Sequence, residues 1–317
     1  MALQYLEFER PIAELEAKIE ELSKLSETAG PGAFDAEITA LRQKVLDLRR
    51  ETYAHLDGWQ KAQVSRHPER PHFVDYVAGL IDEFVELRGD RTFADDQAIM
   101  GGLGRFRGRG VVVMGHERGH DTVSRIKHNW GMARPEGFRK ATRLMDLAER
   151  FGLPVLSFVD TNGAYPGVGS EERSVAEAIA RSTERCLNLG TPMIAVITGE
   201  GGSGGALGIA AGNRVLMLEH AIYSVAPPEA ATAIIVRDGS GSPEAVAKAQ
   251  KITAQDLYAL KVIDRIVPEP VGGAHADPGA AIKATGDAIE DELKRLEPLS
   301  PDALKSQRAE RYLAIGR

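Results

Sequence analysis

The sequence predicts an α/β domain with helical extensions at both ends, on the basis of three observations. The chain has 317 residues, of which 43% are hydrophobic and 27% charged, the proportions of a globular protein. In its middle part, apolar runs of strand length alternate with segments of helical periodicity, as in a sheet covered by helices. Both ends show helical patterns. We therefore expect an N-terminal helical hairpin over 1–70, a core over 71–272 and a C-terminal helical tail over 273–317.

Two amphipathic segments predict the N-terminal hairpin. A breaker run at 29–32 separates them, and Asp35 is the predicted N-cap of the second helix. The pattern leaves open whether the hairpin is a packing appendage or a docking arm for a partner chain. In both segments, apolar residues recur at alternating steps of three and four, which places them on one helix face: Ile12, Leu15, Ile19 and Leu22, then Ile38, Leu41, Val45 and Leu48.

The core elements follow from apolar runs and helical periodicity. The tail helices are expected to start at Asp277-Pro278 and Ser300-Pro301, because Pro is favoured in the first turn behind a capping side chain. In the core, strands are expected at 99–106, 111–114, 155–159, 193–198 and 215–218, and helices at 135–150 and 170–189.

Composition argues against several classes of protein. With 39 Lys and Arg against 46 Asp and Glu, the net charge of −7 does not favour a nucleic-acid binder held by overall charge. The longest charge-free apolar stretch, 186–199, is shorter than the ~20 residues that a bilayer requires, and the N-terminus lacks a secretory pattern. The single cysteine, Cys186, rules out an intrachain disulfide and a cysteine-based zinc site. We expect a cytoplasmic protein without a membrane segment.

One segment is strongly basic within this acidic chain. Between Arg105 and Arg143 there are ten Lys and Arg against three acidic residues. Such a local excess can steer a polyanionic ligand or an acidic partner, or it can be a solvated face without a ligand.

Three short motifs point to different chemistries. HERGH at 116–120 fits a zinc-protease pattern, but it follows a strand-like run and contains Gly119, which disfavours the helix that the pattern needs. GEGGSG at 199–204 fits a dinucleotide-binding pattern, but the space for its crossover helix is short. GGSGG at 201–205 fits a nucleophile elbow with Ser203 as the nucleophile. A serine hydrolase therefore stays open, with partners in hydrolase order: Asp238, Asp256, Asp264 and His275.

The glycines at 199–205 have a physical use of their own. A loop of this kind that enters a helix exposes backbone N–H groups, which together with the helix dipole can hold an anion. The run lacks the Lys-Ser/Thr ending of a phosphate loop, so an oxyanion hole is the favoured use. A second glycine-containing turn, DTNGAYPG at 160–167, follows the preceding strand and is expected at the same end of the sheet.

At these two loops the sequence resembles the alpha subunit of bacterial acetyl-CoA carboxylase carboxyltransferase. The similarity runs nearly end to end, and several long motifs in order are more specific than any short pattern above. The matching segments are GEGGSGGAL at 199–207, DT at 160–161 with GAYPG at 163–167, EER at 171–173, PEGFRKA at 135–141, IVPEP at 266–270, GGAH at 272–275 and the helix start at 8–16.

The resemblance implies a crotonase-like (ClpP/crotonase) spiral of ββα units. It also implies transfer of carboxylate from carboxybiotin, carried on a separate protein, to acetyl-CoA, which gives malonyl-CoA for fatty-acid synthesis. The implied partners are a beta subunit with a four-cysteine zinc ribbon in an α2β2 assembly, the biotin carboxyl carrier protein and biotin carboxylase. No metal is expected in this chain, and no nucleic-acid partner.

By the same resemblance, the backbone N–H groups of Gly204 and Gly205 form the oxyanion hole on the biotin side. Gly163 and Ala164 are candidate donors on the opposing loop, and Ser203 is then a spacer. Tyr165, Gly201 and Gly202 complete the expected substrate-binding set.

The chain departs from the family's usual pattern in three places. Asn162 stands where Pro is usual, APPEAA at 226–231 replaces the usual ISPEGC, and Ile235-Val236 replaces Leu-Trp. A paralogue that acts on another short acyl-CoA, or a subunit kept for assembly, therefore stays open beside the main interpretation.

Overall fold

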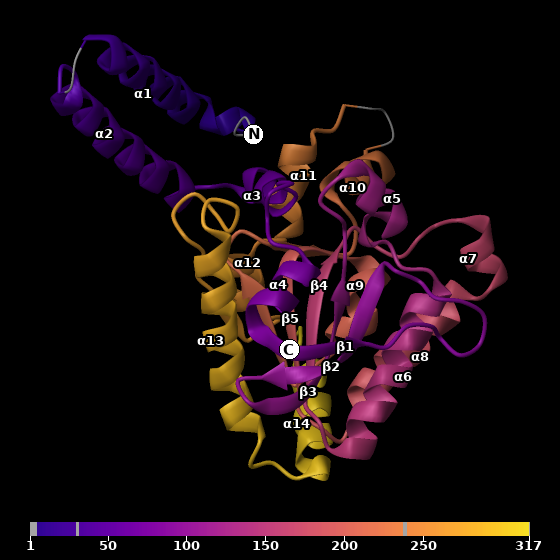
Figure 1. Ribbon diagram of the computed structural model, residues 1–317. Coiled ribbons are helices and arrows are strands. Elements are labelled where there is room, and N and C mark those ends of the chain that lie inside the picture. The colour runs from indigo at the N-terminus through magenta and orange to yellow at the C-terminus, as the bar shows by residue number, and fades with distance from the viewer. Residues whose placement is uncertain (1–4, 30–31, 237–239, 317) are drawn as a thin grey trace.

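One sheet between two layers of helices forms the body of the molecule (Figure 1). The computed structural model describes residues 5–29, 32–236 and 240–316. The strands are β1 (Ile81–Glu86), β2 (Ile99–Phe106), β3 (Arg109–His116), β4 (Val155–Thr161), β5 (Met193–Gly202), β6 (Arg214–Leu218), β7 (Ile222–Ser224) and β8 (Arg265–Val267).

The strand order is β1-β2-β3-β4-β5-β6-β8, with β7 paired to β5. The first three strands are antiparallel, whereas every pair from β3 onward is parallel. β4 and β5 are buried along their whole length, as strands covered on both faces must be.

Helices cover both faces of the sheet. α6 (Pro135–Phe151), α8 (Val175–Asn188) and α9 (Ser203–Ala210) pack on one face, and α4 (Phe73–Leu80) and α13 (Pro278–Leu296) on the other (Figure 1). α14 (Pro301–Leu313) packs against α8. The other helices are α3 (Gly58–Ser65), α5 (Thr122–Lys127), α7 (Val168–Glu172), α10 (Pro228–Ile235), α11 (Pro243–Gln250), α12 (Ala254–Ala259) and the 3-10 turns η1 (Glu7–Glu9) and η2 (Asn129–Gly131).

The N-terminal hairpin consists of α1 (Arg10–Ala29) and α2 (Asp35–Ala54), which project from the body (Figure 1). The prediction of Asp35 as N-cap is wrong: Asp35 is the first helical residue, and Phe34 precedes it without a side-chain cap. The negative charge of Asp35 instead interacts favourably with the positive end of the helix dipole. Residues 30 and 31 of the predicted breaker run lie outside the described residues.

The core prediction is confirmed with one correction. All five expected strands and the tail helices are present, and Asp277 and Ser300 cap the latter through their side chains. The expected helix at 170–189 is two helices, α7 and α8, because Ser174 adopts a left-handed conformation with φ of 64°. Among the described residues, no helix is both long and apolar enough to cross a membrane.

Candidate active site

The carboxyl ends of three neighbouring strands meet at one edge of the sheet. β3 ends at His116, β4 at Thr161 and β5 at Gly202, and the three strands are parallel. The loops that follow β4 and β5 therefore lie side by side. These are the two glycine-containing loops that the sequence singles out.

The two loops pack backbone against backbone, and glycine makes this possible. A Cβ atom at Gly202 would clash with the backbone of Asn162, and one at Gly205 would lie 2.6 Å from the nitrogen of Ala164. Real Cβ atoms essentially never approach another atom so closely. Residues 162–164 and 202–205 therefore act as one structural unit, the loop pair.

Helix α9 begins within this loop pair. Ser203, its first residue, has a left-handed φ of 52°, and Gly202 before it offers no side chain as a cap. The N–H groups of a first helical turn have no acceptor within the helix, and they carry the positive end of its dipole. Gly204 is half-buried, and a Cβ there would meet only Ile179, at 3.4 Å. The start of α9 therefore has the features that favour a negatively charged oxygen, and the oxyanion hole stays a prediction.

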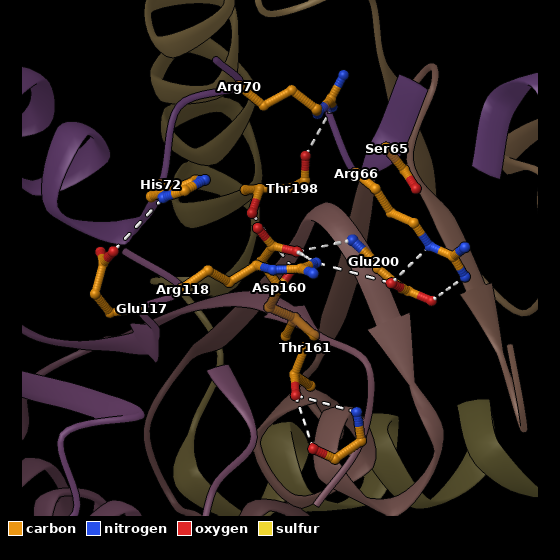
Figure 2. Close-up of polar contacts among 12 residues, drawn as sticks. Ser65, Arg66, Arg70, His72, Glu117, Arg118, Asp160, Thr161, Thr198 and Glu200 are labelled. Atoms are coloured by element: carbon orange, nitrogen blue, oxygen red, sulfur yellow. Dashed lines mark hydrogen bonds and ion pairs between the residues drawn. The ribbon is translucent and has the colours of Figure 1, made fainter. Parts of the chain in front are cut away.

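The prediction for Gly163 needs correction. Its N–H donates to the Thr161 hydroxyl at 3.1 Å, and that hydroxyl donates to the Gly163 carbonyl at 2.8 Å (Figure 2). The Gly163 N–H is therefore used inside the fold and is not a bare oxyanion donor. Gly163 instead lets its loop approach Gly205 closely. Its backbone φ of 150° is one that residues with side chains rarely adopt. Tyr165 packs beneath the Arg134 guanidinium, 4.8 Å from its ring centre.

A largely apolar cavity of about 440 Å³ opens beside the start of α9. Ser203 and Gly204 form one wall, and Gly201 supports another by packing against the Tyr223 ring. The other lining residues are Leu207, Tyr223, Ser224, Val225, Gln250, Lys251, Ile252, Leu257 and Val262.

The cavity does not support the serine hydrolase. Ser203 is exposed at a strand-to-helix turn, as a nucleophile elbow requires, but the described lining offers it no imidazole or carboxylate. His275 stacks on His67 with ring centres 3.8 Å apart. The Asp256 carboxylate accepts the hydroxyl of Thr253, the N-cap of α12, and Asp264 binds Arg311, while Asp238 lies outside the described residues.

A network of charged residues holds the strand ends that precede the loop pair (Figure 2). β5 has extra residues between its pairings with Val159 and Thr161, and the Asp160 carboxylate accepts the Glu200 N–H at 3.0 Å across this bulge. Arg118 binds Asp160 at 3.0 Å, and Arg66 binds Glu200 at 2.8 and 3.0 Å. Hydrogen bonds to both carboxylates thus fix the strand ends that precede the loops.

Sequence reasoning missed the roles of Arg66 and Arg118 in this network. The partners Arg66 and Glu200 are 134 residues apart, so no local pattern connects them. One signal was present: Gly199 lies inside a strand, which often marks a bulge or a close contact. A Cβ at Gly199 would lie 2.6 Å from the Asp160 carboxylate.

The two other motifs have structural explanations. His116 ends β3 and is fully buried, and burial lowers the pKa of its imidazole to about 4, so the ring is neutral near pH 7. Residues 117–120 are not helical, and the half-exposed His120 stacks on His72. No group of potential metal ligands occurs within the described ranges. The crossover helix after the GEGGSG run, α9, has only eight residues, as expected.

Comparison with known proteins identifies the relatives of this chain. Residues 5–316 match the family "Acetyl co-enzyme A carboxylase carboxyltransferase-like". The chain is 72% identical over 317 residues to the acetyl-coenzyme A carboxylase carboxyl transferase subunit alpha of Phenylobacterium zucineum, and 69% identical to that of Caulobacter vibrioides. Each match covers 100% of this chain and 99% of the relative.

Solved structures share the fold at low sequence identity. The beta subunit of Pseudomonas aeruginosa geranyl-CoA carboxylase matches with a TM-score of 0.56 at 16% identity, over 78% of this chain and 46% of its own. The Pseudomonas malonate decarboxylase MdcD-MdcE hetero-dimer matches with a TM-score of 0.55 at 15% identity, over 68% of this chain and 88% of its own. These likenesses confirm the expected crotonase-like fold.

Proposed function

Because this chain belongs to the family of acetyl-CoA carboxylase carboxyltransferase alpha subunits, we propose that it takes part in carboxyl transfer from carboxybiotin to acetyl-CoA, which yields malonyl-CoA. The observation that carries this proposal is the loop pair, which presents the start of α9 beside an apolar cavity. The biotin would be attached to a separate carrier protein.

The cavity suits the ring system of biotin, which is apolar except for its ureido group. Apolar side chains such as Leu207 and Val262 line the cavity, and the polar start of α9 forms one wall. Carboxybiotin, when bound, supplies the carboxyl group and a ureido nitrogen that can take the proton of the acceptor. The N–H groups of Gly204 and Gly205 stabilise the negative charge on the ureido oxygen, and each such donor lowers a barrier by about 3 kcal/mol.

The chemistry needs no side-chain nucleophile, which agrees with the cavity. Ser203 serves as a spacer that takes the left-handed turn into α9. The carboxyl transfer also needs a second oxyanion hole for the acyl-CoA thioester. We assign that hole to a beta subunit, with this chain as half of an α2β2 assembly that meets the biotin carboxyl carrier protein and biotin carboxylase.

Two further features fit this assignment. The projecting hairpin of α1 and α2 is our candidate docking arm for a partner chain. The lone Cys186 is buried and free, which fits a reducing cytoplasm, and a zinc ribbon would belong to the beta subunit.

Reconstitution tests the proposal. The purified chain is mixed with a family beta subunit, carboxybiotin and acetyl-CoA, and malonyl-CoA is measured, with each subunit alone as a control. We expect product only from the mixture. Assembly without product would contradict catalysis and favour a scaffold, whereas product only from propionyl-CoA would favour the paralogue that acts on another short acyl-CoA.

A further inference from the structure

A second pocket, of about 310 Å³, is basic, and Arg66 and Arg118 in its lining bind the carboxylates of Glu200 and Asp160 at the strand ends that precede the loop pair. Its walls come from two segments distant in sequence, 66–72 and 118–130. Gly131, next to the second segment, packs on the end of β4 just before the loop pair, since a Cβ at Gly131 would lie 2.7 Å from the Asp160 carbonyl oxygen. The described lining contains no carboxylate: it consists of Arg66, Pro68, His72, Arg118, Gly119, Arg125 and Trp130.

The arginine side chains in this pocket differ in how many of their N–H groups already have a partner within the fold. Arg66 is held by Glu200 and Glu229. Arg118 uses one terminal nitrogen for Asp160, at 3.0 Å, and for Glu200, at 3.7 Å (Figure 2). Arg125 donates its Nε–H to the Gly119 carbonyl at 3.2 Å, and among the described residues it forms no salt bridge, although the Asp121 carboxylate is near enough to interact with its charge. Arg118 and Arg125 therefore retain donors for an incoming anion.

Several other basic side chains of the segment between Arg105 and Arg143 are engaged within the fold. These are Arg105 with Glu83, Arg107 with Asp287, Arg109 with Glu290, Lys140 with Asp95 and Arg143 with the Leu87 carbonyl. Arg118 and Arg125 are the arginines of this segment that line the pocket.

Trp130 adds an aromatic surface to the pocket. Its side chain is 43% exposed, and its backbone has a φ of 53°, between Asn129 at 49° and Gly131 at 77°. A bulky residue rarely adopts this left-handed conformation, and such strain concentrates at binding sites. The turn is held locally, because the Asn129 side-chain amide donates to the Met132 carbonyl at 2.7 Å.

We propose that this pocket binds a purine nucleotide, with the phosphate on Arg118 and Arg125 and the base against the indole of Trp130. Planar guanidinium groups match phosphate oxygens in pairs, and aromatic side chains stack on any base. Two ligands carry this chemistry: the 3′-phosphoadenosine end of coenzyme A and a free adenine nucleotide. Binding of coenzyme A rests on the proposed function, whereas binding of a free nucleotide does not.

Binding to the full chain tests the inference directly. The chain has two tryptophans, so Trp59→Phe leaves Trp130 as the sole indole reporter. We expect adenosine 3′,5′-bisphosphate to change Trp130 fluorescence saturably, and Arg125→Gln to weaken binding by about tenfold or more, as loss of a charge-assisted hydrogen bond does. Arg105→Gln removes an equal charge from the same segment outside the pocket, and should leave binding unchanged. Thermal unfolding verifies that each variant is folded.

Comparison of ligands separates the sources. Tighter binding of coenzyme A than of dephospho-coenzyme A, lost in Arg125→Gln, would identify coenzyme A, whereas equal or tighter binding of AMP or ATP would identify a free nucleotide. No saturable binding at millimolar ligand, equal binding of adenosine, or equal losses in both arginine variants would overturn the inference. Malonyl-CoA formation by the wild-type complex is measured in parallel, so a failure of this inference is distinguishable from a failure of the proposed function.

Discussion

Replacing Gly205 by alanine tests whether close backbone contact sets the geometry of the site. The new Cβ would lie 2.4 Å from the Gly163 carbonyl carbon, whereas ordinary contact begins at 3.4 Å. The two loops would therefore have to separate by about 1 Å. A displacement of this size in a positioned catalytic group costs about 100-fold in rate, or roughly 3 kcal/mol.

The adjacent Gly204→Ala is the matched control. Its Cβ would meet only Ile179, at 3.4 and 3.5 Å, and the substitution keeps the backbone N–H. We expect kcat to stay near the wild-type value in Gly204→Ala and to fall about 100-fold in Gly205→Ala, measured as malonyl-CoA formation by the reconstituted complex. Overpacking should also destabilise the Gly205→Ala chain by about 1–3 kcal/mol. Full activity of Gly205→Ala, or equal losses in both variants, would refute the reasoning.

Three further predictions follow from named groups. Ser203→Ala should retain carboxyl transfer, and a fluorophosphonate probe should not label the wild-type chain; labelling at Ser203 would revive the hydrolase. Glu269→Gln should lower the free energy of unfolding by about 3–5 kcal/mol in chemical denaturation, because it leaves the Arg70 guanidinium, only 2% exposed, without its ionic partner. The exposed Glu83→Gln should change it by less than about 1 kcal/mol, and equal effects would contradict the argument. Burial lowers the pKa of His275 to about 3 and that of His116 to about 4, so below pH 6.5 the unfolded chain binds two protons that the folded chain does not. The free energy of unfolding should therefore fall by about 4 kcal/mol between pH 7.5 and 5, and a flat profile would disagree.

The sequence predicted the regular elements well because their signals are local. The expected strand at 99–106 coincides with β2, and the capping residues Asp277 and Ser300 occupy their predicted positions. Short elements such as α3 and β7 were missed, because a few residues carry little periodicity. The break at Ser174 was also missed, since packing rather than local preference imposes its left-handed backbone.

For the candidate site, too, the sequence predicted the local features and missed those that depend on the fold. Sequence alone identified the glycines at 199–205, because the absence of a side chain is a property of each residue and does not depend on the fold. It did not show that the Gly163 N–H is already bonded to Thr161, because that bond depends on the exact course of the turn.

The sequence by itself therefore determined the longer strands and helices of the core, the glycine loops and the family to which they belong. Only the tertiary structure decided that the Gly163 N–H is already bonded, how Asp160 and Glu200 are neutralised, and that Arg66 and Arg125 line one pocket. The physical reason is that hydrogen bonds and ion pairs between distant segments form only when the sheet brings the ends of its parallel strands to one edge.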